Sequence, residues 1–178
     1  MHKQPQPDDL EIMEGGAAAS PLPAAPSGWN DPLTGTDGPR LWDRFISSEV
    51  ARVGRYHRPA TVVLVDIAGL DDFARAWGSD VAERLFLQLA RTLAVESRSS
   101  DHIARIDRTR FAILLTETDE IAAINFVERV RDACESQIRT LAQVKIGIGW
   151  AGPSGSTDLR AAIDVAEARL AEELSTTS

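Results

Sequence analysis

Arginine is the residue type with the clearest chemical potential in this sequence. All of the 19 basic residues except Lys3 and Lys145 are arginines. A guanidinium group presents planar, paired N–H donors that match a guanine edge or a phosphate, and it also stacks on aromatic planes. The arginine excess therefore predicts either recognition of guanine or phosphate at selected positions, or a general compositional bias of the genome.

Other reactive side chains are sparse. The single cysteine, Cys134, excludes an internal disulfide framework and a cysteine-based zinc site. The histidines His2, His57 and His102 are scattered along the chain and make no metal-binding cluster. We therefore expect no catalytic metal and no cofactor.

The overall charge restricts the classes of partner. The chain carries 27 acidic against 19 basic residues, a formal net charge of −8. Binding to nucleic acid or to an anionic membrane needs a basic face, and no apolar run approaches the ~20 residues of a membrane span. The N-terminus also lacks a hydrophobic signal core. We expect a cytoplasmic protein with no nucleic-acid binding and no membrane insertion.

The length of 178 residues fits one domain with tails. Residues 1–29 are rich in proline, glycine and alanine and hold few large apolar side chains, so we expect a disordered N-terminal tail. A short partner-binding motif at residues 10–13 is the alternative for this segment. We assign the folded domain to residues 30–174 and a short C-terminal tail to residues 175–178.

The spacing of apolar residues predicts the strands and helices that position the arginines. The run 61–67 is rich in β-branched residues and predicts a buried central strand. Two short strands at 102–106 and 111–116, four residues apart, predict a β-hairpin. A further strand is expected at 144–150, and helices are expected at 41–57, 70–95 (with a break or kink at Gly78), 121–137 and from a cap at 156–158 to about 174. This order contains βαββαβ, which predicts an α/β sandwich of ferredoxin-like character.

Four short motifs occur at defined places along these predicted elements. Residues 31–35 read Asp-Pro-Leu-Thr-Gly, the central strand ends at Asp66, Gly78 follows in the next helix, and the hairpin turn occupies residues 107–111. In this order over residues 31–174, the chain resembles the GGDEF domains of the bacterial diguanylate cyclase family, which carry D-x-L-T-G, D-x-D, N-D-x-x-G-H and G-G-D/E-E-F at these places. The resemblance implies a GGDEF-type sandwich related to nucleotidyl cyclase catalytic domains.

The signature turn departs strongly from the family pattern. It reads Asp107, Arg108, Thr109, Arg110 and Phe111, so only the phenylalanine remains. The resemblance implies a metal held by Asp66 and by the third signature residue, but the neutral Thr109 cannot replace a carboxylate in a Mg²⁺ site. Asp107 and Arg108 replace the glycines that let the backbone approach phosphate. For Asp66 we expect helix capping or a plain surface role.

Further family positions are also changed. The guanine-reading asparagine and acid fall at Ala74 and Glu83, the second acid of D-x-D at Ala68, the neighbouring lysine at Asp71, and a C-terminal lysine at Ala171. We therefore expect a degenerate domain that is not an enzyme, with no catalytic residues.

A second set of family residues is retained. Arg98-Ser99-Ser100-Asp101 ends five residues before the signature, where the resemblance places the R-x-x-D of an inhibitory site for cyclic di-GMP. Arg129 falls on the additional arginine of that site, and Arg52 on a further basic position. A guanidinium pairs with O6 and N7 of guanine, and a carboxylate accepts from its N1–H and amine. The resemblance thus implies binding of cyclic di-GMP by these four residues.

Three functions remain open at this point. We expect a cyclic di-GMP receptor that signals through an unidentified protein partner, with a possible homodimer. The alternative is an interaction module that binds no nucleotide, in which Arg98 and Asp101 form an ordinary surface ion pair. Independently of this choice, Arg108 and Arg110 either clamp an acidic partner or a phosphate, or they lie in a solvated turn. The third function is residual diguanylate cyclase activity.

Overall fold

The structure is a computed structural model that describes residues 21–141, 143–154 and 158–176. The tail predictions for residues 1–20 and 177–178, and the expected cap residues 156 and 157, lie outside the described residues. No helix in the described ranges combines the length and the apolar character that crossing a membrane requires.

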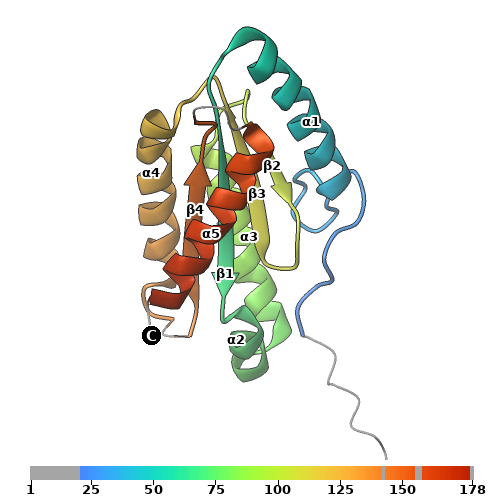
Figure 1. The fold of residues 1–178 in the computed structure, drawn as a ribbon. Coiled ribbons are helices and arrows are strands. Elements are labelled where there is room, and N and C mark those ends of the chain that lie inside the picture. Colours follow the sequence, from blue (N-terminus) through green and yellow to red (C-terminus); the bar gives the residue numbers. More distant parts are fainter. Residues whose placement is uncertain (1–20, 142, 155–157, 177–178) are drawn as a thin grey trace, which may run out of the picture.

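A four-stranded antiparallel sheet with the order β2-β3-β1-β4 organises the described chain (Figure 1). The elements are α1 (Pro39–Tyr56), β1 (Ala60–Ala68), α2 (Leu70–Trp77), α3 (Ser79–Glu96), β2 (His102–Arg105), β3 (Arg110–Thr116), α4 (Glu120–Ile138), β4 (Lys145–Ala151) and α5 (Leu159–Thr176). The predicted α/β sandwich, with its βαββαβ order and its β2–β3 hairpin, is confirmed.

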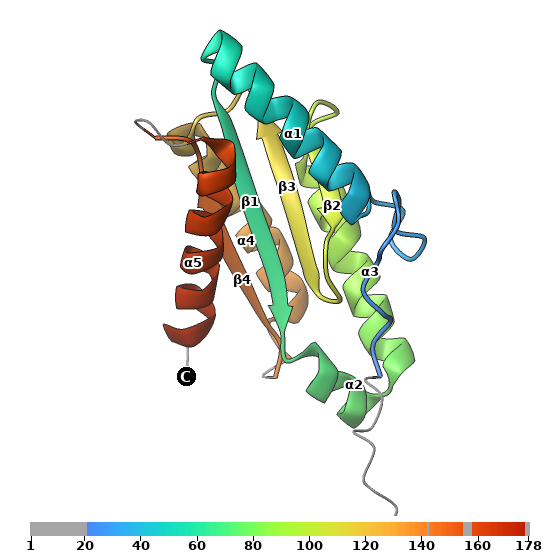
Figure 2. The same ribbon diagram turned by 45° about the vertical axis from the view of Figure 1, so that its right-hand side comes forward.

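Strand β1 lies between the two hydrophobic clusters of the domain. Alternate side chains of a strand point to opposite faces. Val63 and Val65 accordingly belong to the cluster beneath α2, α3 and α4, whereas Val62 and Leu64 belong to the cluster beneath α1 and α5. Figure 2 shows α1 and α5 together on one face of the sheet. Burial on both faces explains why β1 reads as a continuous apolar run.

The predicted long helix over residues 70–95 divides into α2 and α3 at Gly78. This glycine has a φ of +99°, a conformation that residues with a side chain rarely adopt. Trp77, the last residue of α2, is 67% exposed at this break. The segment between β1 and β2 therefore holds two helices that meet at Gly78 rather than one continuous helix.

Residues 21–29, which the composition assigned to the tail, contact the domain. The Leu22 side chain is only 7% exposed and belongs to the larger hydrophobic cluster. The main-chain carbonyl of Leu22 accepts a hydrogen bond from Arg108, and that of Ala24 accepts one from Arg105. Composition alone could not reveal these contacts, because one anchoring leucine and distant arginine donors hold the segment.

Candidate functional site

A cavity of about 280 Å³ lies between the C-terminal end of α3, the end of β3 and the first half of α4. It is lined by Glu96, Arg98, Asp101, Leu115, Thr118, Ala122, Asn125, Phe126 and Arg129. Three of the four residues predicted to bind cyclic di-GMP therefore line one cavity. The turn after α3 supplies two of them, and the exposed side of α4 supplies the third.

The turn that follows α3 holds Arg98 and Asp101 through main-chain contacts. The Oδ2 atom of Asp101 accepts a hydrogen bond from the main-chain N–H of Arg98 at 2.8 Å, and the N–H of Asp101 donates to the carbonyl of Arg98 at 3.0 Å. No ion pair joins the two side chains within the described residues. The sequence spacing thus reflects a tight turn that leaves the guanidinium group of Arg98 available to other partners.

The second carboxylate oxygen of Asp101 is the most informative atom of the cavity. Oδ1 is buried and has no hydrogen-bond partner among the described residues. A buried acceptor without a donor costs about 1–3 kcal/mol. Rotation of the Asp101 side chain toward the cavity would expose this oxygen, and a ligand N–H group could then remove that cost.

Arg129 is held toward the cavity by residues of α3 and α4. Its Nε donates to Oε2 of Glu96 at 3.0 Å, and its terminal nitrogens donate to the carbonyls of Glu96 and Asn125 at 3.3 and 3.2 Å. The guanidinium carbon also lies 5.8 Å from the centre of the Phe126 ring. The side chain is therefore preorganised, but an anionic ligand must compete with the carboxylate of Glu96.

Arg52 is not part of the cavity lining. Its guanidinium group forms ion pairs with Glu49 and Glu117, and the latter residue also pairs with Arg58 at 3.0 Å. The hydrogen bond from Arg52 is the largest cause of a lowered pKa at Glu117, and the bond from Arg58 adds to it. The structure therefore places Arg52 in a surface charge network beside α1, outside the cavity that the other three residues share.

The signature turn is bonded to the end of β1 through Asp66. Oδ1 of Asp66 accepts from the Thr109 hydroxyl at 2.7 Å, and Oδ2 accepts from Nε and Nη2 of Arg110 at 3.1 and 2.8 Å. The expected capping role of Asp66 is wrong, because α2 begins after Gly69 without a side-chain cap. The carboxylate instead fixes the hairpin against the central strand.

The metal that the fold family implies does not fit these side chains as they are arranged. Both oxygens of Asp66 accept from protein donors, one of which is the cationic Arg110. The described ranges contain no group of three or more histidine, cysteine, aspartate or glutamate side chains that could hold a metal ion. We therefore derive no chemical step through a metal at this place.

Arg105 is a structural residue that sequence reasoning missed. Its side chain is 2% exposed and pairs with Asp31, the first residue of the D-x-L-T-G motif, at 3.2 Å. Its guanidinium carbon lies 5.0 Å from the ring centre of Phe86 on α3. The signal was present, since Arg105 is the one charged residue within a strand whose neighbours Ala104 and Ile106 are apolar.

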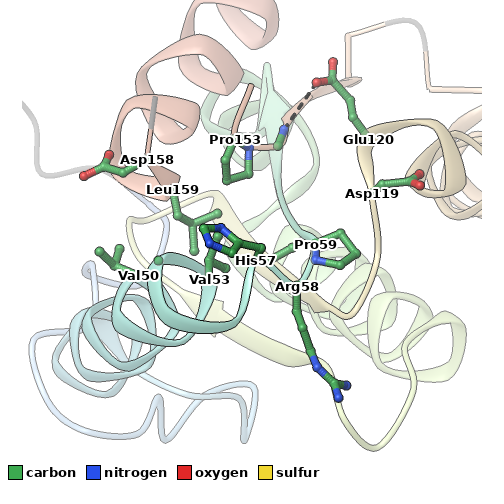
Figure 3. Close-up of a pocket in the computed structure, with 13 residues that line it drawn as sticks. Val50, Val53, His57, Arg58, Pro59, Asp119, Glu120, Pro153, Asp158 and Leu159 are labelled. Carbon is green, nitrogen blue, oxygen red and sulfur yellow. Dashed lines mark hydrogen bonds between the residues drawn. The ribbon is translucent and has the colours of Figure 1, made fainter. Parts of the chain in front are cut away.

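A larger cavity of about 560 Å³ lies at the N-terminal end of α4, between the C-terminal end of α1 and the start of α5 (Figure 3). Figure 3 shows Val53, His57 and Leu159 close together at its centre. Its carboxylates have structural roles, because Asp119 and Asp158 accept main-chain N–H groups in the first turns of α4 and α5 at 2.7 and 3.0 Å. None of the predicted site residues lines this cavity.

The fold and its motifs agree with the comparison against protein families. The model of the family "Diguanylate cyclase, GGDEF domain" matches residues 29–177. The chain therefore belongs to the GGDEF family of diguanylate cyclase domains.

Individual relatives support this assignment. The probable diguanylate cyclase DgcC of Escherichia coli K12 is 30% identical over 102 residues, which make up 57% of this chain and 28% of DgcC. The crystal structure of the diguanylate cyclase SiaD of Pseudomonas aeruginosa, in complex with its activator SiaC, is 25% identical with a TM-score of 0.73 and covers 83% of this chain and 58% of SiaD. The GGDEF domain of DgcB of Caulobacter crescentus, in complex with c-di-GMP, is 15% identical with a TM-score of 0.76 over 85% of this chain and 92% of that domain.

These findings contradict our expectation that the chain is not an enzyme. DgcC and SiaD are both named as diguanylate cyclases, and the chain belongs to the same family. The expectation rested on substitutions at single positions, and such substitutions do not establish that activity is absent. The chain spans less than a third of the length of DgcC, so the activity of that whole protein is not transferred to it.

Proposed function

We propose that this GGDEF domain binds cyclic di-GMP in the cavity formed by Arg98, Asp101 and Arg129. The observation that carries the proposal is that Arg98, Asp101 and Arg129 line one cavity, and that the Asp101 carboxylate keeps one oxygen without a donor among the described residues. The DgcB domain, which shares this fold, has been crystallised with c-di-GMP. The arrangement supports recognition of a guanine base together with a phosphate.

The proposed contacts follow from the hydrogen-bonding groups of guanine. Asp101 accepts from the N1–H and amine of one guanine, while Arg98 donates to its O6 and N7. Arg129 stacks on a base plane or neutralises a phosphate, after the ligand displaces Glu96 from its guanidinium group. Charge-assisted hydrogen bonds of this kind contribute about 1.5–3 kcal/mol each.

Isothermal titration of cyclic di-GMP into the purified full chain tests the proposal. Arg98→Ala and Asp101→Asn should each weaken binding about 10- to 100-fold, because each removes charge-assisted bonds. Arg44→Ala is the matched control, since this exposed arginine on α1 lines none of the cavities described above and should bind as the wild type does. Absence of heat with the wild type at tens of micromolar ligand would refute the proposal.

Synthesis of cyclic di-GMP from GTP is the second candidate function. It is favoured by the names of the relatives DgcC and SiaD. The altered signature turn, in which Arg110 pairs with Asp66, makes ligand binding the first candidate. Incubation of the full chain with GTP and Mg²⁺, followed by chromatography of the products, decides whether the second function is present.

We further propose that the bound state acts through a protein partner. The support is that the SiaD structure contains its activator SiaC, at 25% identity over most of this chain. Affinity purification of the full chain from cell extract, with and without cyclic di-GMP, should recover a partner whose amount depends on the ligand. If the Arg98→Ala variant recovers the same amount of partner as the wild type in the presence of cyclic di-GMP, partner binding does not depend on the cavity.

Sedimentation of the purified chain tests separately whether it forms a homodimer.

A further inference from the structure

The N-terminal segment Leu22–Ala24 contacts the domain in the way that a bound peptide contacts a receptor. One side chain, that of Leu22, is inserted into the larger hydrophobic cluster, while Ala24 is exposed. Within the described chain, no strand pairs with residues 21–24. The family model begins only at residue 29, so this segment is an addition to the matched domain.

Two arginines recognise the main chain of this segment. Arg108 Nη2 donates to the carbonyl of Leu22 at 2.9 Å. Arg105 Nη2 donates to the carbonyls of Ala24 at 3.1 Å and Pro23 at 3.5 Å. Donors on the domain thus meet acceptors on the segment, and the leucine supplies the apolar anchor.

The sequence of the segment suits this mode of recognition. Pro21 and Pro23 flank Leu22 and have no N–H group, so the main chain offers mainly carbonyl acceptors. Proline also restricts the free segment toward an extended conformation, which lowers the entropy lost on binding. An arginine pair with an adjacent apolar slot is therefore complementary to an extended, proline-containing segment with a central leucine.

The donor group of Arg105 is held in place without the segment. Arg105 is fixed from the other side by Asp31 at 3.2 Å, and its Nε and Nη2 also donate to the carbonyl of Arg108 at 3.3 and 2.9 Å. These two bonds join the Arg105 side chain to the main chain of the turn that carries Arg108. The receptor side of the contact is consequently preorganised by the β2–β3 hairpin.

We propose that the slot formed by Arg105, Arg108 and the hydrophobic cluster is a peptide-binding site that the chain's own Leu22–Ala24 segment occupies and can leave. The partner that fits it is an extended protein segment with leucine between prolines. Figures 1 and 2 both show the N-terminal segment running from α1 toward α2 along the edge of the domain. This site is separate from the Arg98–Arg129 cavity and does not depend on cyclic di-GMP.

The first test is fluorescence anisotropy with a labelled peptide of residues 21–30. The full chain carrying Leu22→Asp, checked for its fold by circular dichroism, should bind this peptide at least about tenfold more tightly than the wild type, whose slot is filled. A peptide with Leu22→Asp should not bind, whereas one with Ala25→Asp should bind normally because Ala25 is exposed. Equal or absent binding to both folded proteins would overturn the proposal.

The second test places no charged residue at the buried position 22. In the full chain with Leu22→Cys, the new thiol at position 22 reports opening of the segment, and the buried Cys134 is an internal control. The thiol at position 22 should react with a thiol reagent at least about tenfold faster than Cys134. Equal rates would mean that the segment leaves only when the whole domain unfolds, which contradicts a displaceable segment.

Discussion

Among single residues, Arg105 shows how a charge is accommodated inside this domain. Its carboxylate partner Asp31 is 2% exposed and also accepts hydrogen bonds from Thr34, through the main-chain N–H at 3.1 Å and the hydroxyl at 2.5 Å. Buried charges are tolerated only when they are paired and their hydrogen bonds are satisfied. The D-x-L-T-G motif therefore has a structural role here, because it supplies the counter-charge for the hairpin.

Arg105→Ala should destabilise the domain strongly. Removal of the guanidinium group leaves Asp31 as a buried charge without its partner, and breaking such a pair costs about 3–5 kcal/mol. Urea denaturation should show this loss in the free energy of unfolding. The control Arg44→Ala removes an exposed arginine and should change stability by less than about 0.5 kcal/mol. Similar midpoints for both variants would contradict the role assigned to the buried pair.

Cys134 should be chemically inert in the native protein. Burial is the main cause that raises the pKa of its thiol from 9.0 to about 12, and Glu96 and Glu135 add to the effect. At pH 8 a thiol with this pKa is ionised in only about one molecule in ten thousand, and the thiolate is the reactive form. Labelling with a thiol reagent should therefore be slow in buffer and fast in concentrated urea.

The raised pKa of the Cys134 thiol also determines how the free energy of unfolding changes with pH. The folded pKa lies above the unfolded pKa, so the contribution of Cys134 is fully present below pH 9 and is lost as the pH rises toward 12. Cys134→Ala should reduce the steepness of unfolding in this alkaline range. An identical alkaline transition in the variant would show that other groups dominate it.

Among the elements, β4 and α5 approach each other closely at Gly149. A Cβ atom at Gly149 would lie 2.0 Å from the carbonyl oxygen of Ala166 and 2.6 Å from the main-chain nitrogen of Leu170. The strand can therefore meet the helix backbone only because it carries glycine at this position. This close approach holds α5 on the face of the sheet opposite α4.

Gly149→Ala should displace α5 and destabilise the domain by about 1–3 kcal/mol, because neither neighbouring atom belongs to a flexible side chain. Gly54→Ala is the matched control: Gly54 lies within α1 and has no heavy atom within 4 Å of an added Cβ. It should stabilise the domain by about 0.5–1 kcal/mol through helix propensity. Urea denaturation of the two variants should give shifts of opposite sign.

The elements also show what could be read from the sequence. The β-branched run of β1 and the spacing of the β2–β3 hairpin are local signals, and both elements form as predicted. The placement of Arg98, Asp101 and Arg129 around one cavity followed from a family resemblance, because residues 98 and 129 meet only through tertiary packing. The burial of Leu22 and Arg105 was missed because each depends on a partner far away in sequence.

In the molecule as a whole, the two hydrophobic clusters share one sheet and should unfold together. The cluster beneath α2, α3 and α4 and the cluster beneath α1 and α5 both include side chains of β1 and β3. The cavity proposed for cyclic di-GMP lies between α3, β3 and α4, so it depends on the same folded sheet. Binding there should stabilise every element and not only the neighbouring helices.

Cyclic di-GMP at about 100 times its Kd should add about 2.7 kcal/mol to the free energy of unfolding. For a domain of this size, that corresponds to a rise in Tm of about 5 to 10 °C. The same shift should appear in far-ultraviolet circular dichroism and in tryptophan fluorescence, because Trp42 and Trp150 pack against different clusters. Arg98→Ala should melt as the wild type does without ligand, and at the same ligand concentration its stabilisation should fall to about 0.4–1.4 kcal/mol, because its binding is about 10- to 100-fold weaker. A shift seen by only one of the two probes would contradict unfolding of the described domain as one unit.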